Sequence, residues 1–204
     1  MHNLELSVNP GQWAYFEKRN QDTRFKSFKQ RVADDSNHVC QFCGFKDKKF
    51  MQVVNLDGDY QNNKISNLVL ACPFCAQCSF LEMIGKARLT GGTLINMPEL
   101  SQNDLNGICH ALFFAIVNGT EYADYAQNIY NNIKVRSRSI EDIYGKGLSS
   151  PAFMGQMIID TPIKDRDKLA KKVLYGLRVL PDLKSFSSCV SEWSNSTLQS
   201  MLGK

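Results

Sequence analysis

Two Cys-x2-Cys motifs constrain this chain more than any other feature of its sequence. Cys40 and Cys43 form the first motif, and Cys72 and Cys75 form the second, with residues 44–71 between them. Four thiolates at the corners of a tetrahedron suit Zn²⁺, and each short turn presents two of them to one ion without strain. The spacing therefore predicts one structural Zn²⁺ bound by these four cysteines. Because four sulfur ligands close the coordination sphere, no position is left for an activated water.

Two other uses of paired cysteines fit this sequence less well. A disulfide framework requires an oxidising compartment, and the start of the chain, MHNLELSVNPGQ, has neither the basic residues nor the apolar segment of a signal peptide. A thioredoxin-like redox motif normally presents one Cys-x-x-Cys at the start of a helix in a βαβ unit. We therefore expect a cytoplasmic protein whose cysteine pairs bind metal. Of the other cysteines, Cys78 is a candidate alternate ligand, and Cys109 and Cys189 are expected to be buried.

Length and composition are those of a globular protein. The chain has 204 residues, of which 43% are hydrophobic and 22% charged, and it has no apolar run of the length that spans a bilayer. This length suits one large domain or a small zinc module with a helical domain. We predict an α+β fold in which residues 1–97 hold an N-terminal strand and helix and the zinc module, and residues 98–204 form a helical region packed on it.

The remaining elements are predicted from hydrophobic spacing. Residues 3–8 alternate like an edge strand, and residues 13–34 have a helical pattern. Helical patterns recur at 105–117, after an N-cap pair of Ser101 and Asp104, and at 121–136, 165–179 and 187–202. Residues 137–163 are expected to be irregular. His110 lies in one of the predicted helices, where we expect it to form an interhelical hydrogen bond or to face solvent.

The segment between the cysteine motifs resembles the ββα-metal module of HNH nucleases. FMQVVNL is typical of a short strand, DGDYQNN of a turn-rich loop, and SNLVLAC leads into the second motif. The positions that match the nuclease signature are Leu56, Asp57, Gly58, Asp59, Asn62, Asn63, Asn67, Leu68, Val69, Leu70, Cys72 and Cys75. The resemblance implies an HNH-like arrangement around a four-cysteine zinc site.

The catalytic positions of that signature do not match. In the nucleases, paired histidines supply a metal ligand and the general base, and a histidine after the last cysteine supplies another ligand. Here those three positions hold Val54, Asn55 and Ala76. Valine and alanine cannot bind a metal, and an amide cannot take a proton from water near neutral pH. We therefore expect a protein that is not an enzyme and has no catalytic residues.

A residual nuclease site would have to use other ligands. Catalytic cations need hard oxygen or imidazole ligands around an open position, and Asp57, Asp59 and Asn67 are the nearby candidates. The sequence Asp-Gly-Asp is also ordinary turn chemistry, in which Gly58 adopts a positive φ and the carboxylates cap backbone amides. We favour the turn interpretation and keep a metal-dependent HNH-type nuclease as the alternative function.

Basic residues are concentrated around the first cysteine motif. Residues 17–49 contain nine Lys or Arg against five Asp or Glu, which could fit DNA phosphates. The opposite charges are interleaved, however, and the pI of about 8.6 is below the usual range of nucleic-acid-binding domains. We therefore expect a solvated surface and no nucleic-acid partner, with a non-catalytic DNA-binding module as the alternative.

Longer stretches of the chain resemble the IcmJ family, also called DotN, of Dot/Icm type IVB secretion systems. They include VVNLDGDYQNNKISNLVLACPFCAQCSF, GGTLINMPELSQNDLN and IKDRDKLAKKVLYGLRVLP. The resemblance implies a non-enzymatic subunit of the coupling complex, held at the bacterial inner membrane through its partners. It implies binding to the C-terminal extension of a DotL-like coupling-protein ATPase, beside a DotM-like subunit and adaptors of the IcmS and IcmW type.

Overall fold

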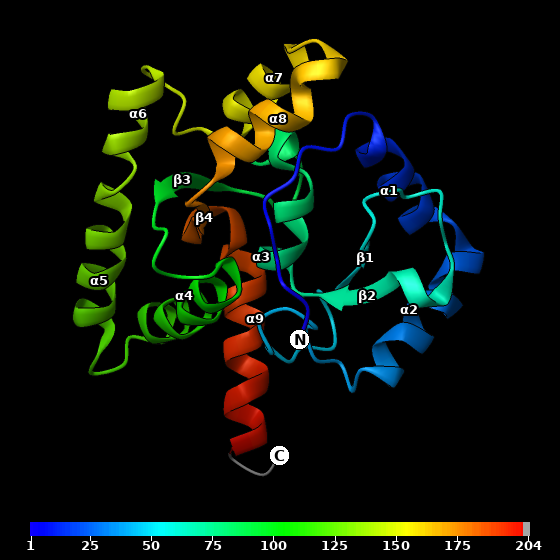
Figure 1. Ribbon diagram of the computed structural model, residues 1–204. Coiled ribbons are helices and arrows are strands. Elements are labelled where there is room, and N and C mark those ends of the chain that lie inside the picture. The colour runs from blue at the N-terminus through cyan, green and yellow to red at the C-terminus, as the bar shows by residue number, and fades with distance from the viewer. Residues whose placement is uncertain (202–204) are drawn as a thin grey trace.

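The protein is a mixture of helices and small antiparallel sheets, in agreement with the predicted α+β class. The computed structural model describes residues 1–201, with side chains up to Trp193 (Figure 1). The helices are α1 (Gln12–Gln21), α2 (Thr23–Asp35), α3 (Pro73–Ala76), α4 (Gln102–Val117), α5 (Ala123–Val135), α6 (Arg138–Tyr144), α7 (Pro151–Asp160), α8 (Ile163–Leu174) and α9 (Leu183–Met201), with 3-10 turns η1 (Ile65–Asn67), η2 (Gln77–Ser79) and η3 (Leu81–Met83).

Two pairs of strands organise the chain. β1 (Gln52–Asn55) pairs antiparallel with β2 (Leu68–Ala71), and α3 follows directly, so the segment between the cysteine motifs has the order β–β–α. β3 (Gly92–Asn96) pairs antiparallel with β4 (Leu177–Pro181). This second pair joins segments on both sides of residue 97. The domain boundary that the sequence predicts at residue 97 stays a prediction.

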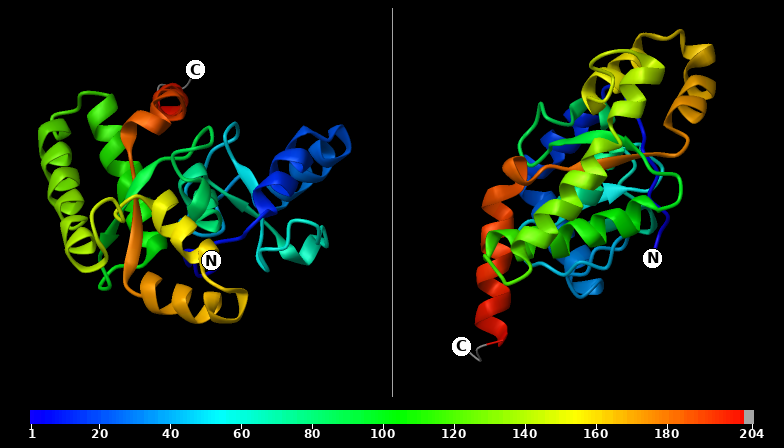
Figure 2. Two further views of the ribbon diagram at one scale, coloured as in Figure 1. Left: turned by 90° about the horizontal axis from the view of Figure 1, so that it is seen from above. Right: turned by 90° about the vertical axis from the view of Figure 1, so that its left-hand side faces the viewer.

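The β1–β2 pair and the cysteine motifs lie near the middle of the molecule. In Figure 1, α1 and α2 lie on one side of this centre, and α4, α5 and α6 lie on the other, with α7 and α8 at the top. The short helix α3 contacts β1, β2 and α4, so it connects the two sides. Helix α9 packs against α4, and its far end points away from the rest of the protein (Figure 2).

The N-terminal elements differ from the prediction in two places. Residues 3–8 form no strand; this segment instead exchanges backbone hydrogen bonds with the region after α3, from Ser7 N to Cys78 O at 3.0 Å and from Leu81 N to Ser7 O at 3.0 Å. The predicted helix 13–34 is two helices, because Asp22 adopts an extended conformation. Its side chain then accepts a hydrogen bond from Arg24 N at 2.9 Å and caps α2.

The C-terminal elements also depart from the predicted spacing. Residues 165–179 were predicted as one helix, but α8 ends at Leu174, and β4 begins at Leu177. Gly176 lies between them with φ 72°, a left-handed conformation that ends helices. The FMGQMII segment, predicted to be irregular, lies in α7, with Pro151 in its first turn. In the predicted helix 187–202, the side chain of Leu198 and all of Leu202 lie outside the described residues.

Candidate metal centre

The four cysteines of the two motifs converge on one point. Their Sγ atoms all lie within 4.8 Å of one another, and Cys43 Sγ lies 3.6 Å from Cys72 Sγ. Among the described residues, these form the one group of three or more His, Cys, Asp or Glu side chains placed to hold a metal ion. The ligand set that the sequence predicts is therefore brought together by the fold.

Local backbone geometry positions each pair of thiols. In the first motif, an isolated bridge joins Val39 to Lys46, and the turn between them is closed by Cys40 N, which donates to Phe45 O at 2.8 Å. Gly44 takes the left-handed conformation that this turn requires, with φ 77°. In the second motif, Cys72 is the N-cap of α3, and Pro73 begins the helix. Both turns leave the two sulfurs of each motif on the same side.

The four sulfurs share one small buried space. Cys40, Cys72 and Cys75 are fully buried. Burial, together with the neighbouring sulfurs, raises the pKa of Cys72 and Cys75 well above the usual range. Four thiolates cannot be ionised together in so small a buried space unless a cation neutralises them. The donor set and its burial therefore fit a soft divalent ion such as Zn²⁺, which binds thiolates and displaces their protons.

Helix α4 supplies two further contacts to the sulfurs. Asn106 Nδ2 donates to Cys75 Sγ at 3.2 Å, and His110 Nε2 lies 3.3 Å from Cys72 Sγ. Burial lowers the pKa of His110 to about 3, so the ring is neutral. Its Nδ1 has no hydrogen-bond partner in the part of the chain that the structure describes. When Cys72 is a metal-bound thiolate, which can only accept, the proton belongs on Nε2, and the ring donates to the sulfur.

His110 was predicted to form an interhelical hydrogen bond or to face solvent. It is buried and contacts Cys72, the N-cap residue of α3, so the first alternative agrees with the structure, but its place beside the metal cluster was not predicted. The imidazole is stacked between Phe45 and Phe74, with ring centroids 3.7 and 4.2 Å away and interplanar angles of 2° and 12°. Phe45 lies two residues after the first motif and Phe74 lies within the second, so the ring links the segments of both motifs to α4. Asn106 and His110 are four residues apart on one helical face, and this spacing was the signal available in the sequence.

The three remaining cysteines lie outside the cluster. All seven cysteines are free of disulfides. Cys78, the candidate alternate ligand, is fully buried, and its Sγ donates to Phe74 O at 3.3 Å. Cys109 and Cys189 are buried as predicted. Burial raises the pKa of all three thiols to about 12, so they stay protonated.

The positions that match nuclease catalytic residues lie in a closed hydrogen-bond network. Val54 and Ala76 are buried apolar side chains. Asn55 Nδ2 donates to Asp59 O and to Asn62 O, both at 2.8 Å, and its Oδ1 accepts from Arg19 Nη1 at 2.6 Å. Both N–H groups of this amide and its oxygen therefore form hydrogen bonds within the protein.

The Asp-Gly-Asp loop has the turn chemistry that the sequence predicts. Asp57 Oδ1 accepts from Asp59 N at 3.0 Å and from Asn67 Nδ2 at 2.8 Å, and Asp57 Oδ2 accepts from Asn62 Nδ2 at 2.6 Å. Gly58 has φ 74°. The carboxylates of this loop therefore bind amide donors, and Asn67 fixes the loop to η1.

No helix in the described part of the chain has the length and apolar character needed to cross a membrane.

Comparison with known proteins identifies a relative that matches nearly the whole chain. The chain is 44% identical over 196 residues to the Type 4 apparatus protein DotN of Legionella pneumophila, and the aligned region covers 96% of this chain and 91% of that protein. No protein-family profile matches the chain.

The fold combines helices with two small sheets and brings four cysteines together. These features define an α+β protein with a candidate metal centre. Its alignment with the Legionella protein covers 96% of the chain at 44% identity. The chain therefore belongs to the DotN family of type 4 apparatus proteins.

Proposed function

We propose that this protein is a non-catalytic, zinc-stabilised subunit of a type IVB secretion coupling complex. In this proposal it binds the C-terminal tail of a DotL-like coupling-protein ATPase and helps to assemble the platform that recruits effectors. A DotM-like subunit and adaptors of the IcmS and IcmW type belong to the same complex, which keeps the protein at the cytoplasmic side of the inner membrane. The observation that carries the proposal is the 44% identity to a type 4 apparatus protein along 96% of the chain.

The metal in this proposal is one Zn²⁺ held by Cys40, Cys43, Cys72 and Cys75. Support comes from the closeness of the four sulfurs and from the N–H groups of Asn106 and His110, which point at two of them. Hydrogen bonds of this kind orient the ligands of metal sites. When bound, the ion supplies structure: it ties the first motif to α3 and, through the hydrogen bonds to the sulfurs, to α4.

The absence of catalysis is also part of the proposal. The order β1–β2–α3 supports descent from an HNH-like module, in which Val54, Asn55 and Ala76 stand at the catalytic positions. The guanidinium of Arg19 adds a second argument, because it bonds to Asn55 Oδ1 and, through Nη2, to Val53 O at 2.7 Å. A fixed positive charge at this place repels the divalent cations that nuclease chemistry needs.

A rigid metal-stabilised core suits the capture of a flexible tail. Grooves that are fixed before binding reduce the conformational entropy lost on association. A disordered tail then loses entropy only on its own side of the interface. A coupling-protein tail that folds onto this protein is therefore a physically reasonable partner.

The decisive experiment is co-expression with the C-terminal extension of the coupling-protein ATPase from the same organism. We expect an equimolar complex in size-exclusion chromatography and a higher Tm of the complex than of the protein alone, since a ligand that binds the native state stabilises it. A matched control uses the tail in scrambled order. Failure of the native tail to co-purify, with correctly folded zinc-loaded protein, would contradict the proposal.

The nuclease and DNA-binding alternatives are tested directly. Purified protein is incubated with plasmid and Mg²⁺ or Mn²⁺, and its binding to a short fluorescent duplex is measured over a range of salt concentrations. We expect no cleavage and no binding at low salt. Cleavage that is lost in Asp57→Ala would establish a nuclease instead, and binding that falls steeply with salt would establish a DNA-binding module.

A further inference from the structure

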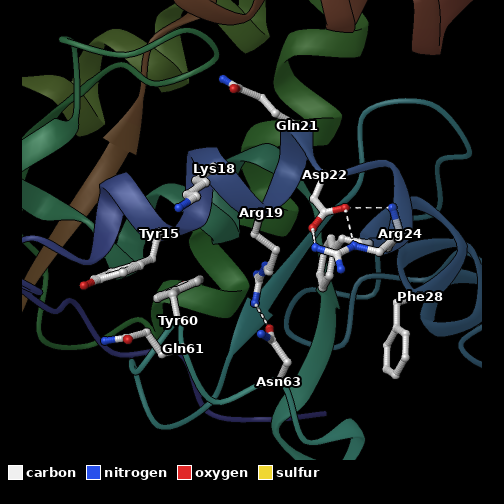
Figure 3. Close-up of a pocket in the computed structure, with 11 residues that line it drawn as sticks. Tyr15, Lys18, Arg19, Gln21, Asp22, Arg24, Phe28, Tyr60, Gln61 and Asn63 are labelled. Carbon is white, nitrogen blue, oxygen red and sulfur yellow. Dashed lines mark hydrogen bonds and ion pairs between the residues drawn. The ribbon is translucent and has the colours of Figure 1, made fainter.

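A cleft of about 670 Å³ opens between α1, the start of α2 and the loop that joins β1 to β2 (Figure 3). Tyr15 and Lys18 line it from α1, Arg24 and Phe28 from α2, and Asn63 from the loop. None of its lining residues is a cysteine of the metal cluster. The cleft is therefore a separate feature from the candidate metal centre.

The cleft has more positive than negative charge. The eleven residues that line it include three cations, Lys18, Arg19 and Arg24, and one carboxylate, Asp22. Asp22 is already engaged by Arg24, from which it accepts hydrogen bonds at 2.9 Å from the backbone N and 3.0 Å from Nη2. Nearby Lys29 has a pKa lowered first by burial and then by the charge of Arg19. The positive potential of the cleft is therefore not neutralised within it.

Arg19 is a buried cation whose hydrogen-bond partners are all neutral. It is 7% exposed, and its Nη1 donates to Asn55 Oδ1 at 2.6 Å and to Asn63 Oδ1 at 3.1 Å, while Nη2 donates to Val53 O at 2.7 Å. Its Nε has no hydrogen-bond partner among residues 1–193. A guanidinium has five N–H donors, of which three bond to these neutral acceptors and the Nε–H is buried. Buried charges in proteins are normally paired with an opposite charge, and Arg19 lacks that anion.

Aromatic rings lie around Arg19 and at the opening of the cleft. The Arg19 Cζ lies 4.4 Å from the centre of the Phe25 ring and 5.1 Å from that of Tyr60. Tyr15 and Phe28 are 43% and 42% exposed, and they lie at the two sides of the opening. Large exposed rings beside cations favour a ligand that combines a negative charge with an apolar group.

A protein segment meets these requirements better than a nucleic acid or a lipid surface. Phosphates of a duplex and lipid headgroups are contacted by cations that stand out from a surface. Arg19 instead lies at the bottom of a concavity, behind aromatic side chains. A carboxylate side chain on an extended or helical segment can enter such a space, and planar carboxylates match the geometry of a guanidinium.

We propose that this cleft docks a segment of a partner protein in which a carboxylate side chain is flanked by an apolar residue. The carboxylate lies among Lys18, Arg19 and Arg24, and the apolar residue packs on Tyr15 and Phe28. This inference goes beyond the proposed function, because it assigns a surface and holds whichever protein supplies the segment.

The experiment uses the full zinc-loaded chain and a random dodecapeptide library displayed on phage. Selected peptides are synthesised with a fluorescent label, and their Kd is measured by anisotropy for the protein and two double variants. Lys18→Gln with Arg24→Gln removes the exposed cations of the cleft. Lys164→Gln with Lys168→Gln removes two exposed cations of α8 and serves as the charge-matched control. All these lysines and Arg24 are surface residues, so both double variants are expected to fold.

We expect the selected peptides to contain an acidic residue next to an aromatic or aliphatic one. Their Kd should rise about tenfold in the cleft variant, equivalent to about 1.4 kcal/mol, and stay unchanged in the α8 control. Replacing the acidic residue of the peptide by its amide should have the same effect as the cleft variant. Peptides without an acidic residue, or equal loss in both variants, would overturn the proposal. So would a short duplex or anionic vesicles that displace the peptide through the same residues. Since no coupling-protein tail is used, the outcome is independent of the test of the proposed function.

Discussion

His110 Nε2 lies 3.3 Å from Cys72 Sγ, and this contact joins helix α4 to the second cysteine motif beside the hydrogen bond from Asn106 to Cys75. The same imidazole is stacked between Phe45, which follows the first motif, and Phe74 of the second. One side chain therefore contributes both to the electrostatics of the metal centre and to the packing around it. Substitutions at His110 can separate the electrostatic contribution from the packing contribution.

His110→Phe and His110→Ala distinguish the two contributions. Phenylalanine keeps a ring between Phe45 and Phe74 but removes the N–H, so we expect zinc affinity to fall about tenfold with a small change in stability. Alanine also leaves a cavity, and we expect a further loss of about 2–4 kcal/mol in the free energy of unfolding. Urea denaturation and competition with a zinc-binding dye measure the two effects. Equal zinc affinity in the wild type and the phenylalanine variant would show that the hydrogen bond to Cys72 is unimportant.

Metal content is tested with a matched pair of cysteine variants. We expect about one equivalent of zinc per purified chain, because four thiolates complete one tetrahedral site. Cys72→Ser removes a proposed ligand and should lose the metal and most of the cooperative unfolding transition. Cys78→Ser changes a buried thiol outside the cluster and should keep the metal. Elemental analysis and thermal unfolding give the answer, and a metal-free wild type with an unchanged Tm would contradict the zinc assignment.

Asn55 is predicted to be a structural residue that anchors Arg19. Asn55→Ala removes the shortest hydrogen bond of the buried guanidinium, to Oδ1 at 2.6 Å, and one of the donors to each of the carbonyls of Asp59 and Asn62. We expect a loss of about 2–3 kcal/mol in the free energy of unfolding. Asn63→Ala is the control, because it removes one 3.1 Å bond to the same guanidinium from an exposed position. It should cost less than about 0.5 kcal/mol. Chemical denaturation measures both, and similar small losses would show that the buried amide is dispensable.

The cysteine cluster could be predicted from the sequence because residues close together in the chain determine where its sulfurs lie. Each Cys-x2-Cys turn fixes two sulfurs, and the ion needs only that the two turns meet. Elements that depend on distant partners were less predictable. β4 forms where a helical pattern continues in the sequence, since its pairing with β3 and the left-handed Gly176 outweigh local propensity. The contact of His110 with Cys72 likewise depends on how α4 packs against the second motif. The spacing of the cysteines does not determine that packing.

Glu82 in η3 predicts a dependence of stability on pH. Its side chain is buried, and neither carboxylate oxygen has a hydrogen-bond partner within the described residues. Burial raises the pKa of Glu82 above its usual value. The protonated form is therefore favoured in the native state, and its contribution to stability is lost as pH rises through the raised pKa.

Glu82→Gln should consequently raise the Tm at pH 8, where the wild type must keep a buried charge or bind a proton. Near pH 3, below the pKa of glutamic acid in the unfolded chain, Glu82 is protonated in both states, so the Tm values of variant and wild type should converge. Glu99→Gln on the surface is the control, since Glu99 pairs with Arg136 and is exposed. Parallel Tm–pH curves for Glu82→Gln and the wild type would show that Glu82 does not titrate in this way.

Two helical glycines give a matched test of packing. At Gly155 in α7, an added Cβ would lie 2.7 Å from the backbone N of Glu82 and 2.8 Å from its Cα, too close for any real contact. At Gly107 in α4, the nearest atom to an added Cβ is Cys43 O at 4.0 Å.

Gly155→Ala must push α7 away from η3, so we expect it to lower the free energy of unfolding by about 1–3 kcal/mol. Gly107→Ala gains helix propensity without a clash and should raise it by about 0.5–1 kcal/mol. Denaturant unfolding of both variants measures the difference, and a stabilised Gly155→Ala would show that α7 does not lie against η3 as closely as these distances require.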